Sequence, residues 1–341
     1  MPGKDKKRSN SGEDDLIELM KSIIGSKPRS LITGIGDDCA VIENDNSGSD
    51  TLVTTDLLVE GSHFKLDWAS PYQIGWKAMA ASVSDIAAMG GRPTFAFISL
   101  GIRTHGRDYF VKSFYEGIQA AAEKYNITVA GGDTVRSDLV VANVTLMGKT
   151  ARGAAITRKG ASAGDIISVT STCGDSLAGL EILKYLTKTG TRPSTYQKQL
   201  IERHSAPTPS VKAGLAASAS GCVKAMMDLS DGILIDLPRL CKINGTGAKI
   251  NTSNLPVSPE LERWAAEAKQ PACEYAIKGG EDFNLLVISD AAKHDQVSNL
   301  MQEIGVELSI IGEITGENNS CVIVSDKGKE TPFSDSGFKH F

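Results

Sequence analysis

Residues 75–93, GWKAMAASVSDIAAMGGRP, decide how the rest of this chain is interpreted. Small and apolar side chains run almost all the way round this stretch, which predicts a helix that is buried on every side. Asp85 lies in its middle, and the positions three and four residues away from it carry no cation. An unpaired buried carboxylate is costly, so Asp85 either pairs with a distant cation or binds a metal ion. Other aspartates decide between the two.

The composition is that of a globular protein with more than one core. The chain has 341 residues, of which 41% are hydrophobic and 23% charged, a length that suits two domains. The net charge of −5, without clustered Lys and Arg, argues against a nucleic-acid partner. Six scattered cysteines without a C-x-x-C pair indicate reduced thiols, so we expect a cytoplasmic protein. Neither a secretory signal nor a membrane-spanning apolar run is visible, so we expect no membrane partner.

Three segments follow from the strand and helix patterns. Residues 1–14 are polar and charged and predict a disordered tail. Residues 15–150 mix strands with two long helices, which predicts an α+β domain. A basic turn rich in small residues marks the boundary, and residues 151–341 alternate strands and helices as in an α/β domain. The predicted fold class is therefore a two-domain protein, α+β followed by α/β.

Aspartates of one kind recur along the chain. Four border strands or lie in turns beside them, and one lies in the central helix: Asp38, Asp56, Asp133, Asp228 and Asp85. A single aspartate in a turn is ordinary, but five with almost no Lys or Arg beside them favour a site for hard cations, and oxygen ligands suit Mg²⁺. Thr54, Thr55 and Ser230 add hydroxyl groups beside these carboxylates.

A carboxylate-lined magnesium site in an acidic protein favours phosphoryl transfer from a nucleotide. The usual nucleotide signatures are nevertheless missing. Residues 143–150, NVTLMGKT, end like a P-loop but begin with Asn143 in place of glycine, and Cys39 replaces the third glycine of a dinucleotide fingerprint. The protein-kinase signatures HRD and DFG are also absent. The sequence therefore predicts nucleotide binding by a less common arrangement.

Seven motifs resemble those of the thiamine-monophosphate kinase family, a branch of the superfamily that includes aminoimidazole ribonucleotide synthase and selenophosphate synthetase. They are GIGDDCAVI (34–42), TTDLLVEGSHF (54–64), SVSDIAAMGGRPT (82–94), VAGGDTVR (129–136), MDLSDGI (227–233), GGEDF (279–283) and GFKHF (337–341). The resemblance implies ATP-dependent phosphorylation of thiamine monophosphate to thiamine diphosphate. It also implies an N-terminal domain whose strands pair with a second subunit, and hence a homodimer.

The resemblance also implies roles for single residues. Those that match metal ligands are Asp38, Thr54, Thr55, Asp56, Asp85, Asp133, Asp228 and Asp231. Those that match nucleotide contacts are Gly132, Asp133, Arg158 and Ser230. Those that match substrate contacts are His63, Glu281 and Phe338. Asp38, Asp85, Asp133 and Arg158 would carry the transfer itself. Phe338 departs from the Trp or Tyr common in the family, which keeps stacking but removes a polar group.

The implied reaction needs neither a general base nor a covalent nucleophile. The acceptor phosphate has a second pKa of about 6 and is largely ionised at neutral pH. The difficulty is to bring two polyanions together, since each charge pair at about 4 Å costs roughly 4 kcal/mol at an effective dielectric of 20. Several Mg²⁺ ions would offset this repulsion and align a direct in-line transfer.

Three alternatives stay open. The chain could act on another substrate of the same superfamily, although it lacks the terminal cysteine of hydrogenase-maturation relatives and ends in Phe341. It could instead phosphorylate a hydroxyl group, which would require a general base. It could also be an inactive regulatory module that binds nucleotide, in which the loss of one or more aspartates would be expected.

Overall fold

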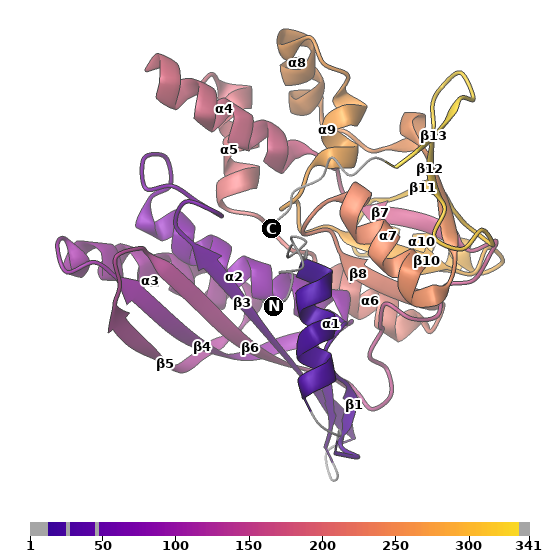
Figure 1. Ribbon diagram of the computed structural model, residues 1–341, viewed down its shortest axis with the longest axis horizontal. Helices are drawn as coiled ribbons and strands as arrows, with labels where there is room; N and C mark the ends of the chain where they lie inside the picture. Colours follow the sequence, from indigo (N-terminus) through magenta and orange to yellow (C-terminus); the bar gives the residue numbers. More distant parts are fainter. Residues whose placement is uncertain (1–12, 25–27, 45–47, 334–341) are drawn as a thin grey trace, which may run out of the picture.

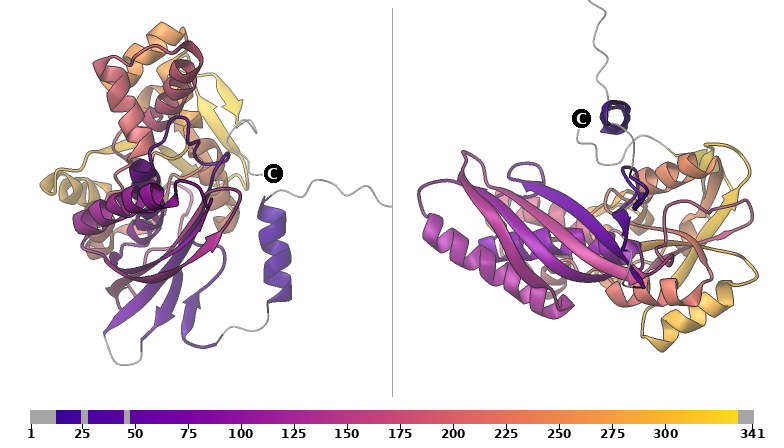
Figure 2. Two further views of the ribbon diagram at one scale, coloured as in Figure 1. Left: turned by 90° about the vertical axis from the view of Figure 1, so that its left-hand side faces the viewer. Right: turned by 90° about the horizontal axis from the view of Figure 1, so that it is seen from below.

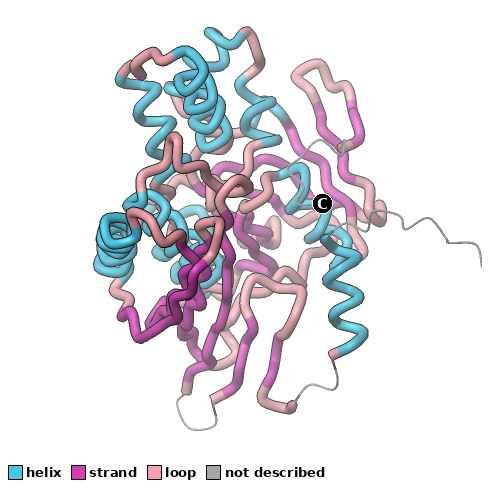
Figure 3. Tube along the Cα trace, turned by 60° about the vertical axis from the view of Figure 1, so that its left-hand side comes forward, coloured by secondary structure: helices cyan, strands magenta, loops and turns pink. Residues whose placement is uncertain are grey.

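The computed structural model describes residues 13–24, 28–44 and 48–333. Its strands gather in two groups (Figure 3), one for each half of the chain. The first sheet has six strands in the order β1-β2-β3-β6-β4-β5, all antiparallel to their neighbours except the parallel pair β4 and β5. Its strands are β1 (Leu31–Thr33), β2 (Ala40–Glu43), β3 (Ser49–Val59), β4 (Arg92–Ile102), β5 (Thr128–Arg136) and β6 (Val141–Ala151).

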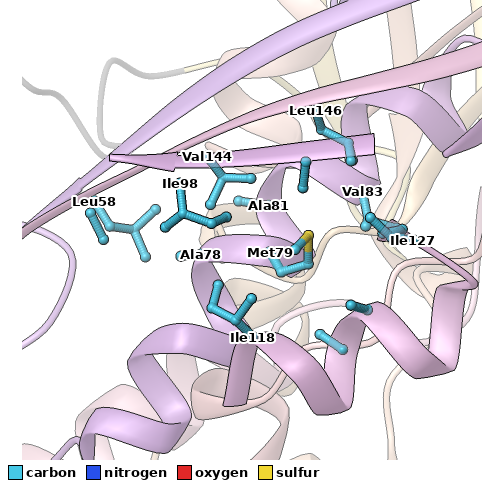
Figure 4. Close-up of a cluster of buried hydrophobic side chains, with 14 of the residues drawn as sticks. Leu58, Ala78, Met79, Ala81, Val83, Ile98, Ile118, Ile127, Val144 and Leu146 are labelled. Carbon is cyan, nitrogen blue, oxygen red and sulfur yellow. The ribbon is translucent and has the colours of Figure 1, made fainter. Parts of the chain in front are cut away.

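One face of this sheet is covered by two helices, α2 (Pro71–Ala88) and α3 (Arg107–Tyr125) (Figures 1 and 2). Side chains from the helices and the strands interlock in the core shown in Figure 4, where Met79 of α2 lies among Ile98, Ile118 and Val144. α2 and α3 approach so closely that a Cβ atom on Gly75 would lie 2.1 Å from the carbonyl oxygen of Phe114. Glycine is therefore required at this crossing.

α2 is the helix predicted from residues 75–93, and it is buried on nearly every side. Its bounds differ from the prediction at both ends. Ser70 caps the N-terminus together with Gln73, so the helix begins one turn earlier. Gly90, with a left-handed φ of 69°, ends it early, and the last predicted residues belong to β4.

The second sheet has seven strands in the order β13-β12-β9-β11-β7-β10-β8, antiparallel except for the parallel pair β9 and β12. Its strands are β7 (Ile166–Thr170), β8 (Val223–Asp228), β9 (Gly247–Asn251), β10 (Leu285–Ser289), β11 (Leu308–Thr315), β12 (Cys321–Val324) and β13 (Glu330–Pro332). Both domains thus combine helices with a mixed sheet, and the predicted fold class is confirmed. The predicted division after residue 150 falls at the end of β6.

The remaining helices belong to the C-terminal domain, and α4, α5 and α8 lie together at the top of Figure 1. These three helices share a separate apolar cluster. The helices of the C-terminal domain are α4 (Asp175–Thr189), α5 (Thr195–Ser205), α6 (Val211–Ser220), α7 (Ile233–Asn244), α8 (Pro259–Ala268), α9 (Ala272–Lys278), α10 (His294–Glu303) and the 3-10 helix η1 (Thr252–Asn254). α1 (Glu13–Ile23) begins two residues inside the predicted tail. Within the described residues, every helix is too short or too polar to cross a bilayer.

In the described part of the chain, one edge of β3 is left unpaired beside α2, and this edge contributes residues to the site. β2 pairs with β3 only as far as Val53, so among the described residues one edge of β3 is unpaired from Thr54 onward. α2 passes behind this edge and also contacts β8 of the second sheet. The free edge of β3, the middle of α2 and the end of β8 therefore meet where the two domains join.

Candidate active site

A cleft of about 1360 Å³ between the two domains contains most of the residues that the sequence analysis selected. The N-terminal domain lines it with the turn before β2, the edge of β3 and one face of α2. The C-terminal domain adds the turns after β8 and before β10. α1 borders the cleft, and its Glu13 pairs with Arg239 of α7 at 3.2 Å.

Three aspartates from three separate elements meet in this cleft. Asp38, Asp85 and Asp228 each place a carboxylate oxygen within 4.8 Å of the other two. Asp85 accepts a hydrogen bond from the hydroxyl group of Thr54. Asp228 accepts one from the hydroxyl group of Ser84 at 2.7 Å. Oxygen atoms grouped in this way form a ligand set for a hard divalent cation.

Arg158 brings a cation to the cluster and pairs with Asp38. Its Nε donates to Asp38 Oδ1 at 3.2 Å, and its Nη2 donates to the same oxygen. The side chain of Asp38 is fully buried, yet its second oxygen has no hydrogen-bond partner among the described residues. One buried oxygen of Asp56 also lacks a hydrogen-bond partner among the described residues. Buried carboxylate oxygens are normally satisfied, and because Asp38 and Asp56 both line the cleft beside Asp85, these two oxygens fit a bound cation.

The carboxylates raise one another's pKa because they are buried together. Burial raises the pKa of Asp85 well above its ordinary value, and Asp56, Asp228 and Asp38 raise it further. Burial, followed by the charge of Asp38, raises the pKa of Asp228 to about 8. Burial and Asp38 also raise the pKa of Asp37 to about 6. Without a bound metal ion, the raised pKa values favour protonation of the cluster, and a divalent ion would replace these protons.

The free edge of β3 explains why three consecutive residues all line the cleft. Thr54 and Asp56 lie on the face of β3 turned toward α2, where the carboxyl group of Asp56 interacts with Ser82 and Asp85. Thr55 lies on the opposite face and accepts a hydrogen bond from Asn143 at 2.9 Å. Because the edge is unpaired, both faces reach the same cleft.

The turn after β8 carries Ser230 and Asp231, which also line the cleft. Asp236 of α7 holds this turn by accepting the backbone N–H groups of Asp231 at 3.0 Å and Gly232 at 2.8 Å. Arg239 donates to the Asp231 carboxylate at 2.5 Å. Asp236 and Arg239 were not predicted as site residues. Their spacing on the helix directly after the aspartate-rich turn was the signal available.

The opposite region of the cleft holds the predicted substrate contacts His63 and Glu281. His63 Nδ1 accepts the backbone N–H of Val59 at 3.1 Å. Glu281 pairs with Lys77 of α2 at 2.8 Å, and His204 of α5 lies 3.5 Å from the same carboxylate oxygen. Lys77 and His204 were missed, because nothing local marks either of them. The third predicted contact, Phe338, lies outside the described residues.

Gly132 and Asp133 do not join this cluster within one chain. They belong to β5, which is separated from β3 by two strands, or about 14 Å from Asp56 at roughly 4.8 Å per strand. Asp133 is exposed and pairs with the exposed Ser99, so it faces away from α2. A Cβ atom on Gly132 would lie 1.8 Å from the carbonyl oxygen of the residue it pairs with, so the β4–β5 contact requires glycine there.

Both halves of the chain match known proteins. The family described as AIR synthase related protein, N-terminal domain, matches residues 36–150, and the corresponding C-terminal domain family matches residues 162–325. Thiamine-monophosphate kinase of Bacillus subtilis (strain 168) is 34% identical over 317 residues, which cover 92% of this chain and 94% of the relative. The enzyme of the same name from Aquifex aeolicus (strain VF5) is 34% identical over 330 residues, or 97% of this chain and 98% of the relative.

A solved structure is similar over nearly the same length. AaThiL complexed with AMPPCP and TMP has a TM-score of 0.84 and 34% sequence identity, and the match covers 97% of each chain. Both domains and their order are therefore shared with these proteins. The chain belongs to the thiamine-monophosphate kinase family, whose two domains here are those of the AIR synthase related proteins.

Proposed function

We propose that this chain transfers the terminal phosphoryl group of ATP to thiamine monophosphate, which yields thiamine diphosphate and ADP, the last step of thiamine diphosphate biosynthesis. The observation that carries the proposal is the meeting of Asp38, Asp85 and Asp228 beside Arg158 in the interdomain cleft. Membership of the family supports it, as does the similarity to AaThiL complexed with AMPPCP and TMP. Six free cysteines favour a cytoplasmic setting.

Several Mg²⁺ ions belong to this proposal. The buried, unpartnered oxygens of Asp38 and Asp56 and the close approach of three carboxylates fit such ions. The residues that would hold them are Asp38, Thr54, Thr55, Asp56, Asp85, Asp228 and Asp231, together with Asp133 from a second copy of the chain. When bound, magnesium would neutralise phosphate charge and favour an in-line arrangement of donor and acceptor.

The residues of the chain then bind and orient the two phosphates. Arg158 would contact the nucleotide phosphates and Ser230 the nucleotide, while His63 and Glu281 would hold the acceptor. The acceptor phosphate is already ionised, so no side chain has to remove a proton from it. Cys39 lies beside Asp38, but burial raises the pKa of its thiol well above its ordinary value, which argues against a covalent nucleophile.

Direct transfer predicts that no phosphorylated enzyme forms. Incubation with γ-labelled ATP and Mg²⁺, without an acceptor, should leave the protein unlabelled after denaturation. A stable label on the chain would refute direct transfer. The reaction itself is tested with Mg-ATP and thiamine monophosphate, with thiamine as the control acceptor. We expect thiamine diphosphate only from the monophosphate. Product from thiamine itself would favour a hydroxyl-directed kinase.

A homodimer would bring Asp133 into the site. The sheet face that α2 and α3 leave uncovered carries exposed apolar side chains from three strands, among them Leu57, Phe97 and Val135. A second copy packed on this face would bury them and approach the free edge of β3. We therefore assign Asp133, with Gly132, to the nucleotide and metal site of the partner subunit.

Mixing two inactive variants tests this assignment. Asp85→Asn and Asp133→Asn should each be nearly inactive alone. After unfolding and refolding together, half of the dimers should be mixed, and each mixed dimer has one complete site. About a quarter of the wild-type activity should then return. If Asp133 acted within its own chain, the mixture would stay inactive. Sedimentation equilibrium of each sample shows whether dimers form.

A further inference from the structure

Three residues of α2 line the cleft at intervals of four. Lys77, Ala81 and Asp85 follow one another along one face of the helix and all border the cleft. Lys77 and Asp85 are separated by about 12 Å along the axis at 1.5 Å per residue. One helix therefore supplies a carboxylate to the acidic cluster and an ammonium group to the region where we propose that the acceptor binds.

Lys77 is buried in a way that is rare for lysine. Its side chain is only 5% exposed, and its Nζ donates to Glu281 Oε2 at 2.8 Å. Buried lysines are almost always paired. This pair joins two elements that are 204 positions apart, one in each domain. Because helical side chains lean toward the N-terminus, Lys77 points away from Asp85 and from the transferring phosphate.

Glu281 needs such a partner. Its backbone adopts a left-handed φ of 61°, a conformation that non-glycine residues seldom hold without support from their surroundings. Its backbone N–H donates to the carbonyl oxygen of Ser230 at 2.7 Å, which sets the main chain. The side chain is 28% exposed and lines the cleft. Among the described residues, no hydrogen bond to its second oxygen, Oε1, is found.

The neighbouring histidine, His204, is not the source of the positive charge beside Glu281. Burial and the charge of Lys77 lower the pKa of His204 to about 3, so its imidazole is neutral near pH 7. His204 Nδ1 lies 3.0 Å from the hydroxyl group of Ser176 and 3.5 Å from Glu281 Oε2. The positive charge on the protein side of Oε2 thus comes from Lys77.

We propose that Lys77 is a positioning residue that determines specificity for the acceptor. Its ammonium group holds Glu281 Oε2, so that Oε1 is directed into the cleft to accept a hydrogen bond from an amino group of the substrate. The aminopyrimidine ring of thiamine monophosphate carries such a donor. This inference rests on the proposed function, because Glu281 is a substrate contact only there.

The test compares Lys77→Met and Lys77→Gln with the matched control Lys77→Arg, which keeps the charge. We expect Met and Gln to raise the KM for thiamine monophosphate by about tenfold or more, since a hydrogen bond to a charged group is lost. Turnover at saturation and the KM for ATP should each change by less than about threefold. Arginine should restore most of the affinity. Calorimetric titration with thiamine monophosphate measures binding without turnover, and thermal unfolding shows that each variant is folded.

A double variant separates positioning from a direct role. If Lys77 acts through Glu281, adding Lys77→Met to Glu281→Gln should raise the KM little further. Unchanged KM values in both the Met and Gln variants would overturn the inference. So would a loss of turnover at unchanged KM, which would place Lys77 at the transferring phosphate. A wild-type protein that forms no thiamine diphosphate would instead refute the proposed function, and titration would still report on Lys77.

Discussion

The Asp85→Asn variant should be more stable than the wild type without magnesium and less stable than the wild type with magnesium. Asp85 lies within 4.8 Å of both Asp38 and Asp228, measured between carboxylate oxygens. At an effective dielectric of about 20, each ionised pair at that distance costs about 3.5 kcal/mol. Asp85 takes part in two of these pairs, so its charge costs about 7 kcal/mol or more when all three are ionised.

Proton uptake relieves much of that repulsion, because burial and Asp38 raise the pKa of Asp228 to about 8. We therefore expect metal-free Asp85→Asn to be more stable than the wild type by at least about 1 kcal/mol at pH 8. Asparagine can still accept the hydrogen bond from Thr54. Magnesium at a hundredfold excess over its Kd should stabilise the wild type by about 2.7 kcal/mol and the variant by far less.

The assay is urea unfolding followed by circular dichroism at pH 8, once with EDTA and once with Mg²⁺. Asp50→Asn is the matched control, because Asp50 is a buried aspartate at the far end of β3, outside the cleft. Its response to magnesium should equal that of the wild type. Equal magnesium stabilisation of Asp85→Asn would refute Asp85 as a ligand. Lower stability of that variant without metal would refute the repulsion argument.

Three further predictions concern other parts of the molecule. Arg158→Gln leaves Asp38 buried without its cation and should cost about 3–5 kcal/mol in EDTA. Urea unfolding should show a smaller loss with Mg²⁺, and an equal loss would contradict a bound cation. Gly132→Ala should destabilise the β4–β5 edge by more than about 1 kcal/mol, whereas Gly131→Ala, whose Cβ would lie 3.4 Å from its nearest neighbour, should be tolerated. Equal losses of thermal stability in the two glycine variants would refute the steric argument. Burial raises the pKa of Asp282 to about 7, so the folded state keeps a proton that the unfolded chain releases near pH 4. Its contribution to the free energy of unfolding should fall as the pH rises from about 4 to 7. Unfolding measured over this pH range should show a weaker pH dependence for Asp282→Asn than for the wild type.

Local pattern in the sequence was enough for several features. The all-round apolar pattern of residues 75–93 predicts a buried helix, because a helix with apolar side chains on every face has to be buried on every side. The isolation of Asp85 from cations could be read in the same stretch, and it led to the expectation of a metal site. The second of the two long helices predicted in the first domain is α3.

Tertiary structure alone decided which of these side chains meet. Lys77 and Glu281 pair across 204 positions, and no local periodicity carries that information. Asp133 has the same kind of sequence context as Asp56, yet strand order and the alternation of faces place it on the other side of the sheet. Arg158 reaches Asp38 only because the two domains close on one cleft. Sequence pattern thus determined the elements and the candidate ligands, whereas register and packing between distant segments determined the site.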